Sequence, residues 1–320
     1  MARRLKLGLI GTGLAARQLY LPAFRELGHR IDLVACANRT RAKAEAYAQE
    51  AGVGRVHDTA EEVIADPDVE AVMISLPIDQ QPHYVLAALG AGKAVMSEKP
   101  NAANAAAGKR LLAAAAKFDV PYLVGENYAF MSHAQQMARW IAQGRLGEIR
   151  LAEVHQLTVM DASVSYFNTS WRAEPAHVGG FVADGGVHAA NLLRRFMGDP
   201  VTVRSLTAQF SPDLPPVDTT VAALLFESGA LGTWTSCFTA QPDGPIVQVY
   251  GAKANAAWYP EYAELTTRNG TVTRAEQKED SFTAQFRHFA DVVVKGTPMA
   301  VTPAETLGDL QLIERILRGR

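Results

Sequence analysis

Residues 7–16 read Leu7-Gly8-Leu9-Ile10-Gly11-Thr12-Gly13-Leu14-Ala15-Ala16 and determine which fold we expect for this 320-residue chain. Its apolar start predicts a buried strand, and the pattern G-x-G-x-x-A then opens a segment with helical spacing. Gly11 permits a tight turn, Gly13 lets the backbone approach a pyrophosphate, and Ala16 allows close packing of helix against strand. The alternative is a purely structural turn. The residues predicted to bind a dinucleotide here are Gly11, Thr12, Gly13, Leu14 and Ala15.

From Lys6 to about Val124, strand-like runs alternate with helical stretches. The expected strands are residues 7–10, 31–37, 69–76, 94–96 and 121–124, and the expected helices are 19–27, 42–51, 83–91 and 102–118. The strands are continuous apolar runs, which is typical of a parallel sheet covered on both faces. The alternation predicts an α/β fold with a Rossmann-like, doubly wound parallel sheet.

After Gly125 the pattern changes to runs separated by turns. The expected strands are residues 151–158, 203–210, 221–226, 231–238 and 246–250, and the expected helices are 132–143, 282–295 and 304–317. Turn-separated strands predict a C-terminal α+β domain with a large, mostly antiparallel sheet. We therefore expect a cofactor-binding domain over residues 1–125 and a substrate-binding and oligomerisation domain over residues 126–320.

The composition excludes several classes of protein. Hydrophobic residues make up 48% and charged residues 20%, and the net charge of -2 gives no electrostatic case for nucleic acid or an anionic membrane. The sequence has no run of 18 apolar residues, so we expect no membrane span. The basic start at residues 2–4 is not followed by a signal-peptide pattern. The cysteines, Cys36 and Cys237, stand in apolar strand contexts where we expect buried thiols. A cytoplasmic protein is the expectation.

The end of the second strand should carry the residue that reads the cofactor ribose. An acidic residue there would repel a 2′-phosphate, but this chain has Asn38-Arg39-Thr40-Arg41. Guanidinium groups pair with phosphate oxygens, so Asn38, Arg39 and Arg41 favour NADP over NAD. In the alternative interpretation, the two arginines only begin a solvated helix.

Two groups of residues are candidates for proton transfer. Glu98-Lys99-Pro100 follows a strand at the carboxyl edge of the sheet, where Lys99 could bond a substrate hydroxyl, although a loop with a salt bridge would look the same. Asp184 and His188 stand four residues apart, on one face of a helix start, as a carboxylate–imidazole pair would.

Two features qualify the interpretation of Asp184 and His188. Gly185 and Gly186 between them would leave room for a ligand. The alternatives are an N-cap aspartate and a core histidine. We expect no metal site, because no third ligand stands at useful spacing.

In its series of motifs the chain resembles the Gfo/Idh/MocA family, named for glucose–fructose oxidoreductase and inositol dehydrogenase. The motifs cover nearly the whole length. They are the stretches 11–16, Leu76-Pro77 through His83 to Gly92-Lys93, Glu98-Lys99-Pro100, Glu126-Asn127-Tyr128, 144–149, Trp171-Arg172 and 179–188. The resemblance implies hydride transfer between NAD(P) and a hydroxyl or carbonyl carbon, most often of a sugar or cyclic polyol.

The resemblance also implies residue roles. Lys99 would meet substrate and nicotinamide, and Asp184 and His188 would form the acid–base pair, with His188 accepting the proton. The implied substrate-binding residues are Tyr128, Trp171, Arg172, Asp184 and His188. The predicted cofactor-binding residues are extended to Leu76, Pro77, His83, Glu98 and Lys99. Asn191 and Ala129 depart from the family, which often has an acidic residue and an arginine there, so the substrate contacts are expected to differ.

Other interpretations remain open. A glycosidase that oxidises its substrate transiently, and a regulator that senses NAD(P) without turnover, would share this fold. The resemblance implies a homodimer or homotetramer formed through the open face of the second sheet. Trp234 and Phe238 share one face by period-two counting and would suit that contact, unless the protein's own helices cover the face.

Overall fold

The computed structural model describes residues 3–319, and Ala2 of the basic start lies outside them. The chain forms two compact units, one of residues 1–127 and 280–307, the other of residues 128–279 and 308–320. This division differs from the expected contiguous domains because α9 (Ser281–Lys295) returns to the first unit. There Phe286 and Phe289 are fully buried in the core that also holds Leu7 and Leu9.

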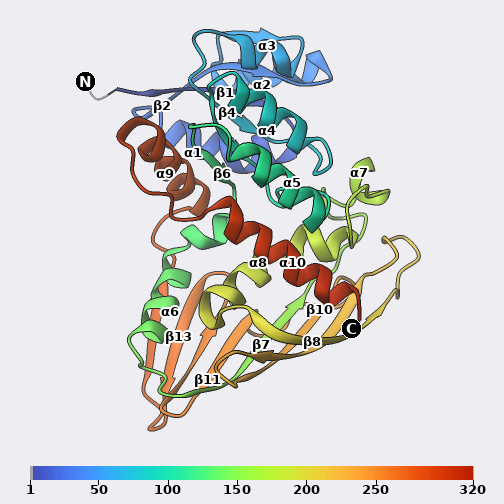
Figure 1. The fold of residues 1–320 in the computed structure, drawn as a ribbon, viewed down its shortest axis with the longest axis vertical. Helices are drawn as coiled ribbons and strands as arrows, with labels where there is room; N and C mark the ends of the chain where they lie inside the picture. Colours follow the sequence, from blue (N-terminus) through green and yellow to red (C-terminus); the bar gives the residue numbers. More distant parts are fainter. Residues whose placement is uncertain (1–2, 320) are drawn as a thin grey trace. The chain divides into compact units, whose positions relative to one another are not determined.

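The first unit holds a six-stranded sheet in the order β3-β2-β1-β4-β5-β6, and every pair is parallel. Its strands are β1 (Leu5–Ile10), β2 (Ile31–Ala37), β3 (Arg55–His57), β4 (Ala71–Ile74), β5 (Ala94–Ser97) and β6 (Tyr122–Val124). Its helices are η1 (Ala16–Tyr20), α1 (Leu21–Glu26), α2 (Arg41–Ala51), α3 (Ala60–Ala65), α4 (Gln81–Gly90), α5 (Ala105–Ala115) and α9 (Figure 1). The predicted doubly wound parallel sheet is confirmed.

Two separate cores show that helices cover both faces of this sheet. Leu9 and Met73 face one core, which takes side chains of α1, α2 and α9. Val72 and Ile74 face the other core, which takes side chains of α3, α4 and α5. Because each strand is buried on both sides, its sequence is a continuous apolar run.

The sequence interpretation missed β3 and α3. The three residues of β3 are all only partly buried, and α3 has six residues. Neither element is long enough to show a hydrophobic period.

The second unit holds an eight-stranded sheet in the order β14-β13-β12-β11-β7-β10-β9-β8. Only β7 and β10 pair in parallel, so the predicted mostly antiparallel sheet is confirmed. Its strands are β7 (Ile149–Leu157), β8 (Pro200–Ala208), β9 (Thr219–Phe226), β10 (Leu231–Cys237), β11 (Val247–Gly251), β12 (Ala254–Trp258), β13 (Tyr262–Thr267) and β14 (Val272–Glu276). The last three were not predicted, because their small and polar residues give little apolar signal.

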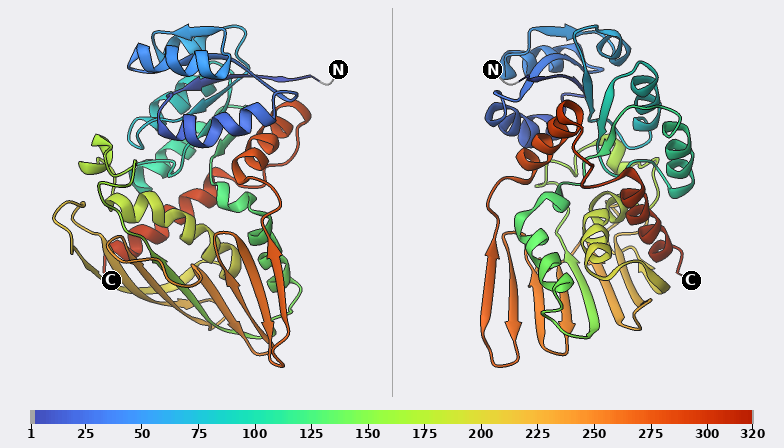
Figure 2. Two further views of the ribbon diagram at one scale, coloured as in Figure 1. Left: turned by 180° about the vertical axis from the view of Figure 1, so that it is seen from behind. Right: turned by 60° about the vertical axis from the view of Figure 1, so that its left-hand side comes forward.

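Helices cover one face of this sheet. Figures 1 and 2 show α6 (Ser132–Ala142) and α8 (Gly180–Met197) against it. α10 (Pro303–Leu317) adds Leu312, Ile313 and Ile316 to the same core.

The side chains of β10 show which face is covered. Trp234 and Phe238 are buried in the core, with 0% and 3% exposure, so the prediction that they form a subunit contact is wrong and the helix-covered alternative is correct. Leu231 is 59% exposed on the opposite face. Cys36 is buried as expected, whereas Cys237 is only partly buried, because it ends β10 on that open face. Among the described residues, no helix is both long and apolar enough to cross a membrane.

Candidate functional site

The glycine turn joins β1 to the helical segment that begins at Leu14. Gly11 has a φ of +97°, and a Cβ there would lie 2.1 Å from the carbonyl oxygen of Ser75. Its N–H donates to the Ala37 carbonyl at 2.9 Å, so this glycine lies where β1, β2 and β4 end together. Only glycine fits this position, as the motif predicts.

The rest of the turn is shaped to receive a ligand. Gly13 is exposed, and a Cβ added to it would meet nothing within 4 Å. Thr12 is 1% exposed, and its hydroxyl has no hydrogen-bond partner among the described residues. An open glycine beside a helix start and an orphaned buried hydroxyl fit a dinucleotide pyrophosphate, whose oxygens accept hydrogen bonds.

The residues after β2 do not behave alike. Asn38 accepts from the Thr12 N–H at 3.4 Å and donates to the Thr40 carbonyl at 3.2 Å, so it links the turn to the next segment. Arg41 pairs with Glu45 at 2.8 Å and also with Asp58, and these contacts raise the pKa of its guanidinium. Arg39 is exposed and forms no ion pair with any residue from 3 to 319. Of the two arginines, Arg39 is therefore the one whose guanidinium is not paired with a carboxylate among residues 3–319.

Glu98 and Lys99 follow β5 at the same edge of the sheet. The Glu98 N–H donates to the Ile74 carbonyl at 3.0 Å, and the Lys99 N–H donates to the Glu98 carboxylate at 3.1 Å. That carboxylate also accepts from the hydroxyl of Tyr20, a fully buried residue of η1. The Lys99–Pro100 peptide is cis. Lys99 is thus held through its backbone by a carboxylate that is tied to the helix after the glycine turn.

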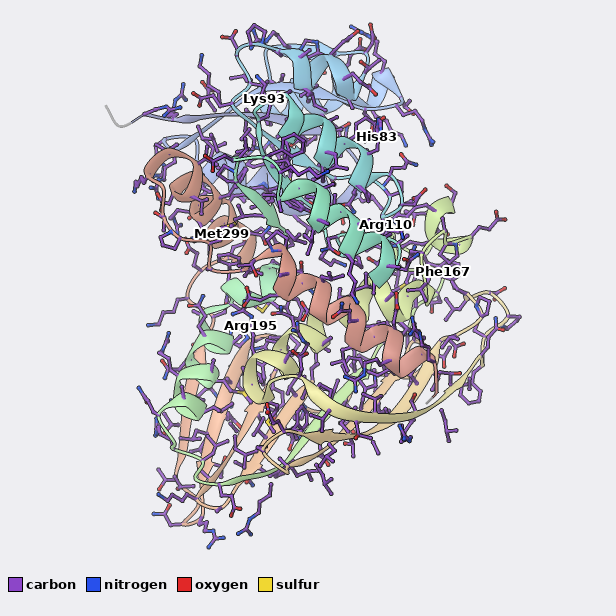
Figure 3. The ribbon with its side chains drawn as sticks, viewed as in Figure 1. His83, Lys93, Arg110, Phe167, Arg195 and Met299 are labelled. Carbon is purple, nitrogen blue, oxygen red and sulfur yellow. The ribbon has the colours of Figure 1, made fainter. Side chains whose placement is uncertain are left out.

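The other predicted cofactor residues of this unit divide into two groups. Leu76 lies at the turn, with its Cδ2 3.2 Å from the position of a Gly11 Cβ, and Pro77 follows it. His83 is exposed on α4, where Figure 3 labels it, and its ring centroid lies 4.9 Å from that of Tyr84. Lys93, which belongs to one of the motifs that carry the resemblance, donates to the backbone carbonyls of Asp66 and Val69. It thereby ties the loop before β4 to the loop before β5.

In the second unit, α8 carries Asp184 and His188 one turn apart. Asp184 is 8% exposed, and its carboxylate accepts from Arg172 Nε at 2.7 Å. The Arg172 guanidinium lies 3.9 Å from the Trp171 ring centroid and 4.8 Å from that of Tyr166. The pair is therefore mostly removed from water and held between aromatic rings, so Arg172 compensates the buried charge of Asp184.

His188 is held by its ring face. It stacks on Tyr128, with ring centroids 4.3 Å apart and an interplanar angle of 13°. Both residues are partly exposed, so neither ring is sealed within the core. The structure thus brings Trp171, Arg172 and Asp184 together, and Tyr128 and His188 together.

The two glycines between Asp184 and His188 do not leave space for a ligand. A Cβ on Gly186 would lie 3.1 Å from Ile313, and one on Gly185 would lie 3.4 Å from the Phe238 ring. Gly186 lets α8 pack closely on α10, whereas a Cβ at Gly185 would make an ordinary van der Waals contact. The expectation of ligand room there was wrong.

The departure at Asn191 has a structural reason. Its amide donates to Asp309 at 2.8 Å, and Arg194 pairs with the same carboxylate at 2.5 Å. An acidic residue at position 191 would face Asp309 with like charge. Ala129, the other position at which the chain departs from the family, is buried, with only 6% of its surface exposed.

Sequence reasoning missed three aromatic residues that contact these groups. Tyr20 donates to Glu98, Tyr166 lies against Arg172, and the Trp258 ring lies 5.4 Å from that of Tyr128. Each is an aromatic residue within an apolar or irregular stretch, and only the fold shows its partner. Among residues 3–319, no cluster of three or more His, Cys, Asp or Glu could hold a metal ion.

Comparison with known proteins agrees with these features. Residues 5–126 match the family model described as "Oxidoreductase family, NAD-binding Rossmann fold", and residues 134–257 match "GFO/IDH/MocA C-terminal domain". A solved oxidoreductase of Thermotoga maritima is 30% identical with a TM-score of 0.94, covering 99% of this chain and 97% of that one.

Two curated relatives act on sugars by name. A 1,5-anhydro-D-fructose reductase of Ensifer adhaerens is 29% identical, covering 78% of this chain and 74% of the relative. A D-xylose 1-dehydrogenase (NADP(+)) of Haloferax volcanii is 27% identical, covering 97% and 95%. The chain belongs to the Gfo/Idh/MocA family of oxidoreductases, and its cofactor is NAD or NADP.

Proposed function

We propose that this oxidoreductase transfers hydride between NAD(P) and the hydroxyl or carbonyl carbon of a sugar or cyclic polyol. The observation that carries the proposal is α8, which presents the imidazole of His188 one turn after an aspartate neutralised by Arg172. An imidazole that is partly exposed and held in its plane by a stacked ring is suited to exchanging a proton with a substrate hydroxyl. The sugar-acting relatives support the substrate class.

NAD(P), held at the glycine turn, would supply the hydride acceptor of the oxidation and the hydride donor of the reduction. His188 takes the hydroxyl proton as the carbonyl forms and gives it back in the reverse direction. Lys99 donates a hydrogen bond to the same oxygen and stabilises its developing negative charge. Asp184 keeps Arg172 in place, and Arg172 presents its remaining N–H groups to substrate oxygens.

We propose NADP as the preferred cofactor, with Arg39 as the residue that recognises the 2′-phosphate. The Arg41 guanidinium is already engaged by Glu45 and Asp58, whereas Arg39 has no ion pair among residues 3–319. Asn38 follows β2 where an acidic residue would repel the phosphate.

The experiment is a comparison of Lys99→Ala and His188→Ala with two controls. Each substitution should lower turnover by at least ~10²-fold while NADP still binds. The exposed residues Lys117 and His29 provide matched controls, and K117A and H29A should leave turnover unchanged. Near wild-type turnover in both K99A and H188A, measured by nicotinamide absorbance with a panel of sugars and polyols, would contradict the proposal.

The same assay separates the two alternatives. One mole of reduced cofactor per mole of substrate excludes a glycosidase that restores its cofactor in each cycle. Tight NADP binding without turnover of any substrate in the panel would favour the regulator. A cytoplasmic location remains our proposal, on the basis of the two free cysteines.

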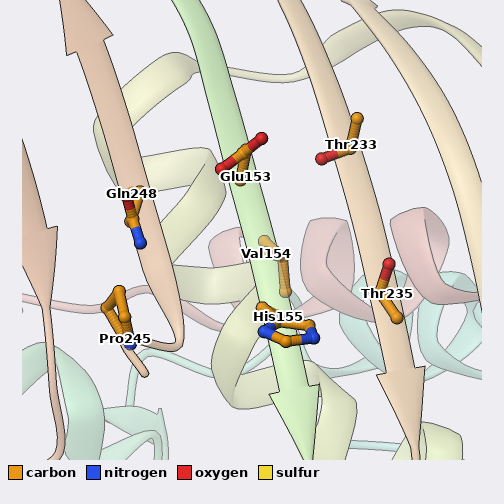
Figure 4. Close-up of a pocket in the computed structure, with 7 residues that line it drawn as sticks. All are labelled: Glu153, Val154, His155, Thr233, Thr235, Pro245 and Gln248. Carbon is orange, nitrogen blue, oxygen red and sulfur yellow. The ribbon is translucent and has the colours of Figure 1, made fainter. Parts of the chain in front are cut away.

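We also propose that the open face of the second sheet binds another copy of the chain. Leu206, Val221 and Leu231 lie on three neighbouring strands there, with 79%, 48% and 59% exposure. Beside them is a pocket with both polar and apolar lining (Figure 4). Its lining residues are Glu153, Val154, His155, Thr233, Thr235, Pro245 and Gln248. An exposed apolar patch with polar surroundings is typical of a subunit contact.

Sedimentation equilibrium tests the assembly. The wild type should sediment as a dimer or tetramer, and the double variant Val221→Lys, Leu231→Asp as a smaller species with unchanged circular dichroism. A monomeric wild type would contradict the proposal.

A further inference from the structure

Tyr128 meets His188 through the face of its ring. The two rings are nearly parallel, at 13°, and their centroids are 4.3 Å apart. A residue that serves the substrate through its hydroxyl does not require this arrangement. A face stack instead fixes the plane of the imidazole, so that both ring nitrogens are directed along one plane.

The row of rings continues from Tyr128 into the core. The Trp258 ring lies 5.4 Å from that of Tyr128, tilted by 37°, and is fully buried at the end of β12. Trp258 also stacks on His133, with centroids 5.2 Å apart and planes 9° apart. Four rings therefore follow one another from a buried histidine to the partly exposed His188.

The buried end of this stack is fixed by hydrogen bonds. His133 Nδ1 lies 2.8 Å from Gln277 Oε1, and His133 Nε2 lies 3.1 Å from the Tyr259 carbonyl oxygen. The Gln277 amide is itself oriented, because its Oε1 accepts from the Ser132 N–H at 3.0 Å. Burial lowers the pKa of His133, so its neutral ring carries one N–H, which donates to one of these two oxygens and restrains the buried end of the row.

We propose that Tyr128 is a positioning residue, which acts through His188 by holding the imidazole plane, and that Trp258 supports it from behind. This inference rests on the proposed role of His188 in proton transfer. According to this inference, the functional part of Tyr128 is the face of its ring and not its hydroxyl. Proton transfer depends steeply on donor–acceptor alignment, so loss of the stack should reduce turnover more than substrate binding.

The test compares Tyr128→Phe, which keeps the ring, with Tyr128→Leu, which removes it. Y128F keeps the stacked ring and is therefore the reference against which the loss of the ring is measured. We expect Y128L to lose about 10- to 100-fold in kcat with KM within about threefold, because the imidazole is no longer oriented. If Y128F raises KM by about tenfold or more, or Y128L keeps kcat, the positioning role is wrong.

A spectroscopic measurement separates positioning from a structural role. In protein labelled with ¹³C at the histidine ring, the His188 Cε1–H resonance is assigned by its absence in H188A. Stacking on a tyrosine ring should shift it upfield in wild type and Y128F, and Y128L should lose that shift. An unchanged resonance in Y128L would overturn the inference.

If Y128L does not fold, Tyr128→Met supplies a flexible, unbranched side chain that adapts to the gap without an aromatic face, and it should give the same results. The two proposals fail separately. If H188A retains turnover, the proposed function is wrong. If H188A is inactive while Y128L or Y128M is fully active, only the positioning inference is wrong.

Discussion

The proposed cofactor turn (residues 11–16) and the proposed proton-transfer cluster around α8 (Tyr128, Arg172, Asp184 and His188) are built in opposite ways. At the turn, the decisive atoms are backbone and empty space, since Gly11 needs its positive φ and Gly13 leaves an open approach. Around α8, side chains hold one another: Arg172 holds Asp184, and Tyr128 holds His188. A site made of backbone leaves a pattern in the sequence, whereas a site made of mutual side-chain contacts depends on the fold.

This difference predicts how each region fails. Substitution at the turn should act on folding or on cofactor binding according to which glycine is changed. Substitution around α8 should act in pairs, because each side chain depends on a partner.

The largest effect is expected at Gly11. Gly11→Ala places a Cβ 2.1 Å from the Ser75 carbonyl oxygen at a φ of +97°, so the strand ends must move apart. We expect a loss of more than ~4 kcal/mol in the free energy of unfolding, or no folded protein. Urea denaturation measures it.

Gly13→Ala is the matched control, because a Cβ there meets no atom within 4 Å. It should keep the free energy of unfolding within ~0.5 kcal/mol. It should still weaken NADP binding by at least about tenfold, because the methyl group occupies the approach to the backbone. Equal stability of the two variants would show that the turn is not built from backbone constraints.

The next largest effect concerns the Arg172–Asp184 pair. Arg172→Leu leaves a carboxylate that is 8% exposed without its cation, at an expected cost of ~3 kcal/mol in the free energy of unfolding. The double variant Arg172→Leu, Asp184→Leu removes both charges and should be more stable than R172L alone. A double variant that is less stable than R172L would show that the two side chains act independently. It would contradict the view that the side chains around α8 hold one another.

The same contrast explains which parts of the fold and the site could be predicted from the sequence. The parallel sheet, the antiparallel sheet and the place of Lys99 were predictable because strand runs, glycine spacing and a strand-ending Lys-Pro are local patterns. The return of α9 to the first unit was not, because its buried Phe286 and Phe289 fit any amphipathic helix. Tyr20 was missed for a similar reason, since its bond to Glu98 joins residues 78 positions apart.

A smaller effect is expected at the arginines after β2. Arg39→Ala should weaken NADP about tenfold or more and leave NAD unchanged, because a charged hydrogen bond to the 2′-phosphate is lost. Arg41→Ala should change both affinities little, since its guanidinium is engaged by Glu45 and Asp58. Fluorescence titration with both cofactors measures the ratio. A larger loss in R41A than in R39A would reverse the assignment.

The smallest effect separates two buried tyrosines of the first unit. Tyr20→Phe removes the donor to the Glu98 carboxylate, which also accepts from the Lys99 N–H, so we expect a loss of several-fold in kcat through misplacement of Lys99. Tyr47 is equally buried, but its hydroxyl has no hydrogen-bond partner among the described residues. Tyr47→Phe should therefore leave kcat unchanged and keep or raise the free energy of unfolding, by up to ~1 kcal/mol. If Y20F matches Y47F in both kcat and stability, the bond from Tyr20 to Glu98 does not position Lys99, and the cofactor region relies on backbone alone.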